Sequence, residues 1–150
     1  MLDGPFAARR GSCDVSTARE RLDIDLIHGY LSQSYWAAGI PRAVVERALA
    51  HSLNFGLYDN GAQIGFARVV TDGATFAYLA DVVIVPDRRG EGLGRWLIET
   101  VLTHPALSGL RRFLLATRDA HGLYAPLGFM PLARPERFME IHRPDVYGGG

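Results

Sequence analysis

Apolar positions recur with two different periods along this 150-residue chain, and the change of period marks the expected elements. In residues 25–34 and 42–52 they lie three and four positions apart, which predicts two short helices. Two apolar runs then flank Asn60-Gly61, a dipeptide that accepts the positive φ angles of a tight β-turn. The pattern therefore predicts a helical start followed by a β-hairpin.

The run TFAYLADVVIVP, residues 75–86, predicts a long strand that is mostly apolar on both faces. Strict alternation puts Leu79, Asp81, Val83 and Val85 on the same face. Because both faces are apolar, the strand belongs in the middle of a sheet. The later elements expected from the pattern are a helix over 93–102, a short strand from Phe113, a brief helix over 120–127, and closing strands at 129–132 and 138–142.

The length and composition favour one domain, because 150 residues that are 48% hydrophobic can bury a single core. The mixture of helices and strands predicts an α/β fold over residues 22–147. Residues 1–21 show no sustained period, so we expect a flexible N-terminal leader, and residues 148–150 are expected to be frayed.

The charge balance argues against a protein held on a large polyanion. Sixteen basic residues offset sixteen acidic ones, so no overall field favours nucleic acid or an anionic membrane. One cysteine, Cys13, excludes an internal disulfide, and the five histidines have no metal-ligand spacing. We therefore expect a cytoplasmic protein without a metal, a nucleic-acid partner or a membrane partner.

The most informative stretch is RRGEGLG, residues 88–94, between the long strand and the next helix. The first N–H groups of a helix have no partner within it, and the helix dipole adds positive potential there. Glycines and arginines beside those donors suit an anion such as pyrophosphate. The alternative is a tight connection whose arginines are merely solvated. The chain lacks the Gly-Lys-Ser/Thr sequence of a P-loop and the Gly-x-Gly-x-x-Gly spacing of a dinucleotide site, so neither is expected.

Two motifs resemble the GNAT superfamily of acetyl-coenzyme-A-dependent N-acetyltransferases. Arg89-x-x-Gly92-x-Gly94 is similar to its (Gln/Arg)-x-x-Gly-x-(Gly/Ala) signature, and residues 123–129, LYAPLGF, resemble its LY-x-x-x-GF segment. The resemblance implies a mixed, mostly antiparallel sheet with a splayed central strand pair. It also implies acetyl-coenzyme A as co-substrate and an amine-bearing small molecule or peptide as acceptor.

The resemblance implies a role for each matching position. The main chain of Val83, Ile84 and Val85 would pair with pantetheine, with an oxyanion donor near Val83. Tyr124 would protonate the leaving thiolate, and Thr117 stands where the family commonly has an asparagine. The amides expected around the pyrophosphate are those of Arg89, Gly90, Gly92, Leu93, Gly94 and Arg95.

Several alternatives remain open at this stage. Asp81 is a candidate general base or a partner of Arg68, and His121 is a second candidate base one helical turn before Tyr124. Tyr124 itself has the alternative of an aromatic packing residue. The runner-up function is a non-catalytic acyl-coenzyme-A-binding sensor, and a homodimer is possible. Aromatic residues expected either to shape the acceptor pocket or to pack under a loop are Tyr30, Tyr35 and Trp36.

Overall fold

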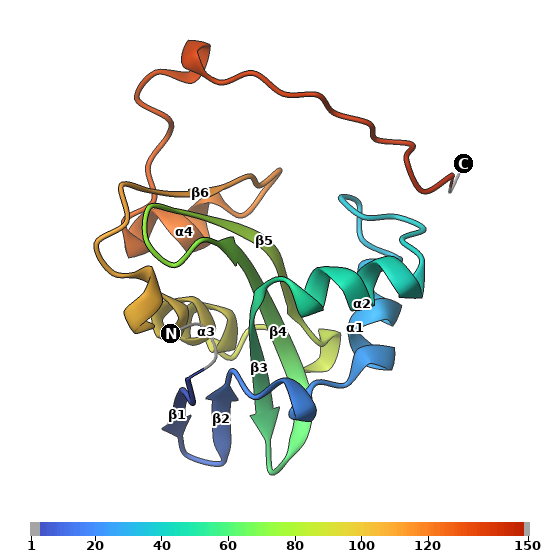
Figure 1. Ribbon diagram of the computed structural model, residues 1–150. Helices are drawn as coiled ribbons and strands as arrows, with labels where there is room; N and C mark the ends of the chain where they lie inside the picture. Colours follow the sequence, from blue (N-terminus) through green and yellow to red (C-terminus); the bar gives the residue numbers. More distant parts are fainter. Residues whose placement is uncertain (1–3, 149–150) are drawn as a thin grey trace.

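The computed structural model describes residues 4–148 and contains a six-stranded mixed sheet in the order β1-β2-β3-β4-β5-β6 (Figure 1). Neighbouring strands are antiparallel except for the parallel pair β5–β6. The mixed, mostly antiparallel α/β architecture is therefore confirmed. The strands are β1 (Ala7–Arg10), β2 (Cys13–Ser16), β3 (Leu53–Asp59), β4 (Ala62–Thr71), β5 (Phe76–Ile84) and β6 (Arg112–Leu115). The helices are α1 (Ile24–Leu31), α2 (Arg42–Ala50), α3 (Leu93–Leu102) and α4 (His121–Tyr124).

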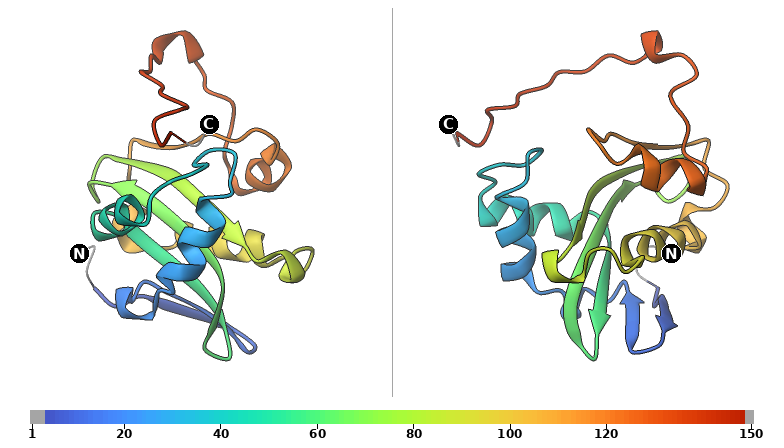
Figure 2. Two further views of the ribbon diagram at one scale, coloured as in Figure 1. Left: turned by 90° about the vertical axis from the view of Figure 1, so that its right-hand side faces the viewer. Right: turned by 180° about the vertical axis from the view of Figure 1, so that it is seen from behind.

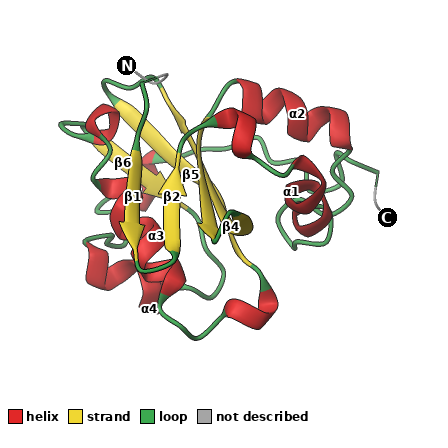
Figure 3. Ribbon diagram, turned by 90° about the horizontal axis from the view of Figure 1, so that it is seen from below, coloured by secondary structure: helices red, strands yellow, loops and turns green. Residues whose placement is uncertain are grey.

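Helices cover both faces of the sheet. Helices α1 and α2 lie on one face and α3 on the other, as the views from the side and from behind show (Figure 2). Seen from below, the strands lie between these two helical layers (Figure 3). Phe66 of β4 joins the core cluster beneath α1 and α2, whereas its neighbour Ala67 joins the cluster beneath α3. Burial on both faces therefore makes β4 a central strand.

The expected hairpin is confirmed at Asn60-Gly61. Both residues have positive φ angles, 48° and 88°, between β3 and β4. Asparagine and glycine adopt this conformation at little cost, which fixes the turn and hence the strand register. The two helices before the hairpin also form, at the positions that the apolar spacing predicts.

The expectation of a flexible leader is wrong for residues 7–16. These residues form β1 and β2, which extend the sheet beyond β3. Val15 is fully buried and Cys13 nearly so, because alternate residues of β2 face the α3-side core. A turn at Gly11, whose φ is 63°, joins the two strands. The expected leader residues 1–3, and residues 149–150 of the expected frayed end, lie outside the described part of the chain.

A β-bulge changes the face assignment within β5. Arg68 of β4 pairs with Asp81, but the next residue, Val69, pairs with Leu79, so Ala80 is an extra residue in β5. Leu79 therefore packs in the α3-side core, whereas Val83 packs against the cluster of α1 and α2. The expectation that Leu79, Asp81 and Val83 share a face is wrong, because a bulge interrupts the alternation of period two.

The two expected closing strands are absent from the described residues 4–148. Residues 129–132 and 138–142 have no assigned strand, and the sheet ends at β6. Figure 1 shows the orange-to-red chain leaving the body near β6 and crossing toward the side of α1 and α2. The local pattern favours extended backbone there, but a strand also needs a neighbour that supplies hydrogen bonds.

The close packing of Gly56 generates a stability prediction. A Cβ at Gly56 would lie 2.2 Å from the hydroxyl oxygen of Tyr58, whose ring is fully buried and cannot swing away. We expect Gly56→Ala to lower the free energy of unfolding by about 1–3 kcal/mol. Gly29→Ala, inside α1 with nothing within 4 Å, should instead raise it by about 0.5–1 kcal/mol. Urea denaturation of both variants checks this, and equal effects would contradict the packing account.

Candidate active site

A cleft opens where β5 and β6 part. The two strands pair only between residues 76–79 and 112–115, and β5 then continues to Ile84 while β6 ends at Leu115. The resulting cleft has a volume of about 1080 Å³. Its walls are residues 78–84 of β5, residues 115–120 after β6, and residues 33–36 of the loop between α1 and α2. The bulge at Ala80 lies where the strands separate.

Main-chain groups of β5 point into this cleft. The N–H of Val85 donates to the carbonyl oxygen of Ile64 on the β4 side, at 2.9 Å. Because main-chain direction alternates along a strand, Val83 faces β4 as well, whereas Val82 and Ile84 face the cleft. Val83 and Val85, whose main chain was expected to pair with pantetheine, therefore face β4, and the main-chain groups that face the cleft are those of Val82 and Ile84. The guanidinium Nε of Arg89 already donates to the carbonyl oxygen of Ile84, at 3.0 Å.

The N-terminus of α3 adjoins the same cleft. Gly92 is its N-cap residue in the left-handed conformation, with φ 78°, and the first intrahelical bond runs from the N–H of Trp96 to the oxygen of Gly92. The N–H groups of residues 93–95 precede that bond, so they are the donors that an anion can use. A Cβ at Gly90 or Gly92 would meet nothing within 4 Å, and both φ angles are positive. These glycines are therefore required by the backbone conformation of the turn.

The arginines of this turn have different partners. Arg88 forms ion pairs with Asp59, at 2.8 Å, and with Glu91, and these carboxylates raise the pKa of its guanidinium. Arg95 is paired with Glu99 one helical turn away. Arg89 and Gly94 line the cleft, whereas Arg88 and Arg95 do not. Arg89 is therefore the arginine of this turn placed to meet an anion at the cleft.

Tyr124, at the end of α4, also lines the cleft. It is 8% exposed, and its ring stacks edge-on against Phe129 with centroids 5.8 Å apart. Burial is the main cause that raises the pKa of the Tyr124 phenol, and the nearby Tyr35 adds to it. The hydroxyl therefore keeps its proton at neutral pH. The sequence motif and the packing thus place a protonated hydroxyl group in the wall of the cleft.

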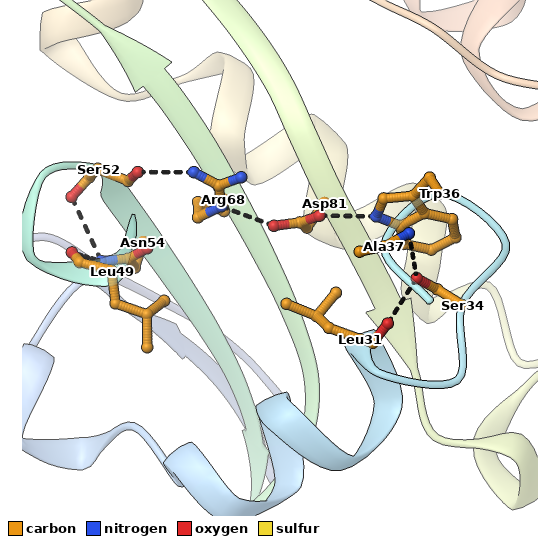
Figure 4. Close-up of polar contacts among 9 residues, drawn as sticks. All are labelled: Leu31, Ser34, Trp36, Ala37, Leu49, Ser52, Asn54, Arg68 and Asp81. Carbon is orange, nitrogen blue, oxygen red and sulfur yellow. Dashed lines mark hydrogen bonds and ion pairs between the residues drawn. The ribbon is translucent and has the colours of Figure 1, made fainter. Parts of the chain in front are cut away.

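Asp81 also lines the cleft, but both of its carboxylate oxygens accept hydrogen bonds. Arg68 Nε donates to one at 2.6 Å, and the indole N–H of Trp36 donates to the other at 2.7 Å. Arg68 in turn donates to the hydroxyl of Ser52, and Figure 4 shows the chain of contacts running from β3 across β4 and β5 to the aromatic loop. The expected Arg68 partnership is thus present, and Asp81 attaches Trp36 to the sheet.

A second contact joins the two rims of the cleft. The guanidinium of Arg118, which follows β6, lies 4.0 Å from the ring centroid of Tyr35 in the α1–α2 loop. The backbone N–H of Arg118 also donates to the Tyr35 hydroxyl, at 3.1 Å. Sequence reasoning did not single out Arg118, because its partner is 83 residues away and no local pattern links the two.

The remaining candidates lie around this cleft. His121 lines a separate hollow on the other side of Tyr124. The Thr117 hydroxyl accepts a bond from the Ala120 N–H, so it serves the local turn. Within residues 4–148, no group of three potential ligands could hold a metal ion, and no helix is long and apolar enough to cross a membrane. Expected site residues that line the cleft are Asp81, Val83, Ile84, Arg89, Gly94 and Tyr124. Those placed around the turn but outside the cleft lining are Val85, Gly90, Gly92, Leu93 and Arg95.

Comparison with known proteins defines the class. Residues 20–129 match the family model described as the acetyltransferase (GNAT) family. A solved GNAT-family structure from Xanthomonas campestris pv. campestris is 51% identical, with a TM-score of 0.87 over 95% of this chain and 97% of that one. A Gibberella zeae protein named as an acetyltransferase is 37% identical, over 77% of each chain. Serotonin N-acetyltransferase 2 of rice is 34% identical, over 83% of this chain and 61% of its own length.

The chain belongs to the GNAT acetyltransferase family, which confirms the resemblance found in the sequence. It is therefore an acyltransferase enzyme, and the family uses acetyl-coenzyme A.

The Asp81 network generates a kinetic prediction. Trp36→Phe keeps an aromatic ring but removes the N–H that reaches Asp81, so the aromatic loop should loosen. We expect the KM for an accepted amine to rise several-fold while kcat changes little, because the loss falls on positioning. If Asp81 acts only by holding Trp36 and Arg68, Asp81→Asn should change KM in the same direction.

The same pair of variants separates the two roles of Asp81. A general base would make Asp81→Asn lower kcat by on the order of 100-fold and remove the acidic limb of the pH–rate profile. Trp36→Phe would leave both kcat and the acidic limb of the pH–rate profile unchanged. Thermal unfolding of each variant is the control. Asp81→Asn leaves Arg68 without its carboxylate partner, so it should lower the free energy of unfolding by about 3 kcal/mol.

Proposed function

We propose that the protein moves the acetyl group of acetyl-coenzyme A directly to a primary amine bound in the cleft between β5 and β6. The observation that carries this proposal is the outward-facing main chain of Val82 and Ile84, between the N-terminus of α3 and the hydroxyl of Tyr124. One end offers donors for a pyrophosphate, the middle offers strand-like hydrogen bonds, and the other end offers a proton. An extended thioester with a diphosphate fits this order.

Each part of the cleft has a role in the proposed reaction. The neutral amine nitrogen attacks the thioester carbonyl carbon, and the N–H of Val82 is the main-chain donor for the oxyanion that forms. The carbon–sulfur bond then breaks, and the thiolate takes the proton of the Tyr124 hydroxyl. The amine loses a proton to a base, for which Asp81 and His121 remain candidates. His121 lies outside the cleft lining, which favours Asp81 or water.

The acceptor end of the cleft is aromatic. Tyr30, Tyr35 and Trp36 line it together with Tyr78 of β5. Such rings favour an acceptor with an apolar or aromatic body, and their faces attract a cationic amine before it is deprotonated. The name of the rice relative, a serotonin N-acetyltransferase, is consistent with an arylalkylamine. We propose arylalkylamines as the first class of acceptor to test. The assay measures release of free coenzyme A with phenethylamine and tryptamine, and compares it with release in the presence of an aminosugar or a peptide.

Gly92 provides a test of the anion site. Gly92→Glu puts a carboxylate beside the free amides of α3, so we expect acetyl-coenzyme A affinity, measured by calorimetry, to fall by more than about 100-fold. Gly11→Glu is the matched control, because Gly11 also has a positive φ and open space but lies in the β1–β2 turn. Equal affinity in the two folded variants would remove the α3 turn from the cofactor site.

Tyr124→Phe tests the proton donor, since it removes one oxygen and keeps the ring. If the hydroxyl acts in the transition state, single-turnover acetyl transfer should slow by on the order of 100-fold while cofactor affinity changes little. Tyr58→Phe is the control, because Tyr58 is also buried but lies on β3 outside the cleft. A Tyr124→Phe rate within about 3-fold of the parent would show that the ring only packs.

A further inference from the structure

Arg118 brings a positive charge to the cleft that its surroundings barely neutralise. Within residues 4–148 its guanidinium donates no hydrogen bond, and its ion pair is a 3.7 Å contact with the adjacent Asp119. The two side chains are 65% and 69% exposed, so this contact contributes little. An arginine carries five N–H donors in a planar fork, which matches the two oxygens of a carboxylate. The fork of Arg118 is therefore available to a ligand in the cleft that it lines.

Tyr35 holds this guanidinium at the acceptor end of the cleft. The guanidinium carbon lies 4.0 Å from the Tyr35 ring centroid, and the backbone N–H of Arg118 donates to the Tyr35 hydroxyl. Tyr35 in turn packs edge-on against Trp36, and it contributes to the raised pKa of the Tyr124 phenol. A guanidinium that stacks on a ring uses its face, so the N–H groups at its edge can still bind an anion.

The strand register relates Arg118 to the proposed reaction centre. β5 and β6 run parallel, and their last pair is Leu79 with Leu115. Three residues further along each chain come Val82 and Arg118, and both line the cleft. Because parallel neighbours advance together, these two residues lie at a similar height on opposite sides of the opening. The arginine thus faces the level at which the main chain of Val82 meets the thioester in the proposed reaction.

The other charged side chains of the cleft wall, apart from the exposed Asp119, are already engaged. Asp81 accepts hydrogen bonds at both carboxylate oxygens, and Arg68 balances its charge (Figure 4). Arg89, near the N-terminus of α3, donates to a main-chain carbonyl oxygen. Among the described residues, the acceptor end therefore holds one positive charge, that of Arg118, without a hydrogen-bonded counter-charge. Such a site favours an anionic group and opposes an acceptor with a second ammonium group.

We propose that Arg118 binds a carboxylate of the acceptor, so that the acceptor is an arylalkylamine with an acid group, such as an aromatic amino acid. This inference rests on the proposed function, because it adds one group to the acceptor named there. The aromatic wall receives the ring of the acceptor, and the fork of Arg118 receives its carboxylate. Since Arg118 and Val82 lie at a similar height, the carboxylate belongs close to the reacting amine, as in an α-amino acid.

Binding of two reaction products tests the proposal without turnover. N-acetyltryptophan and N-acetyltryptamine differ only in the carboxylate, and calorimetry on the full chain at saturating coenzyme A gives both affinities. We expect the parent to bind N-acetyltryptophan at least about 10-fold more tightly, the effect of one charge-assisted contact. Arg118→Gln should bring this ratio to about 1, whereas Arg118→Lys should keep part of it, because the charge remains without the fork. Equal affinities in the parent, or no measurable binding of N-acetyltryptophan, would overturn the proposal.

The ratio of affinities separates recognition of a carboxylate from a structural role. If Arg118 served only to hold Tyr35 and its loop, Arg118→Gln would weaken both products by the same factor, which would contradict the proposal. Arg47→Gln is the matched control, because Arg47 is an exposed arginine of α2 outside the cleft lining, and it should keep the parent ratio. If Arg118→Gln lowered the affinity for coenzyme A as much as that for N-acetyltryptophan, the guanidinium would belong to the cofactor site instead.

Turnover distinguishes failure of this inference from failure of the proposed function. The kcat/KM for release of coenzyme A should be higher with tryptophan than with tryptamine or tryptophan amide, whose amide is uncharged where tryptophan has its carboxylate. A higher kcat/KM with tryptamine would overturn the carboxylate site and leave the proposed acetyl transfer standing. No release with any amine would contradict the proposed function, and the ratio of product affinities would then decide on the carboxylate site alone.

Discussion

β5 carries one more residue than β4 between Leu79 and Asp81, and the site depends on this bulge. A bulge increases the local twist of a strand, so β5 turns away from β6 directly after their last paired residues, Leu79 and Leu115. The separation leaves main-chain groups of Val82 and Ile84 without a strand neighbour on the cleft side. A straight strand would have continued pairing with any extension of β6 and left no cleft between them.

The same bulge determines which side chains face the α1–α2 loop. It places Asp81 on the side of the α1–α2 loop, where its carboxylate binds Trp36 and the neighbouring Arg68. Loss of either donor would leave a buried carboxylate oxygen without a partner, which is costly, so the two bonds hold the loop against the sheet. The loop then reaches Arg118 through Tyr35, so the two rims of the cleft are connected. The bulge in β5 and the side-chain contacts of the α1–α2 loop thus shape the same cleft.

Local signals predicted much of the fold. Asn60-Gly61 fixed the hairpin, and the apolar spacing located α1, α2 and α3 because amphipathic helices need one apolar stripe. The GNAT motifs identified the glycine turn and Tyr124, both of which adjoin the cleft. β1 and β2 were missed because four-residue strands give a weak pattern. The sequence signal for β2 was the placement of the apolar Cys13 and Val15 at alternate positions, and both side chains are buried.

Other features depend on contacts that no local pattern contains. The bulge at Ala80 has no glycine or proline to mark it, so strict alternation assigned Leu79 and Asp81 to one face. The direction of the main chain at Val85 follows from its bond to Ile64, which requires the register of β4. Residues 138–142 have the composition of a strand, but a pattern of side chains does not say whether a strand edge lies beside them.

Hydrogen exchange at the amides of β5 tests the central claim most directly. At a concentration of acetyl-coenzyme A that calorimetry shows to be saturating, exchange at Val82 and Ile84 and in the first turn of α3 should slow by at least about 10-fold. The amide of Val85, already bonded to Ile64, should change little. Saturated binding without added protection at Val82 and Ile84 would contradict the account, because the cofactor would then lie elsewhere than in the opening between β5 and β6.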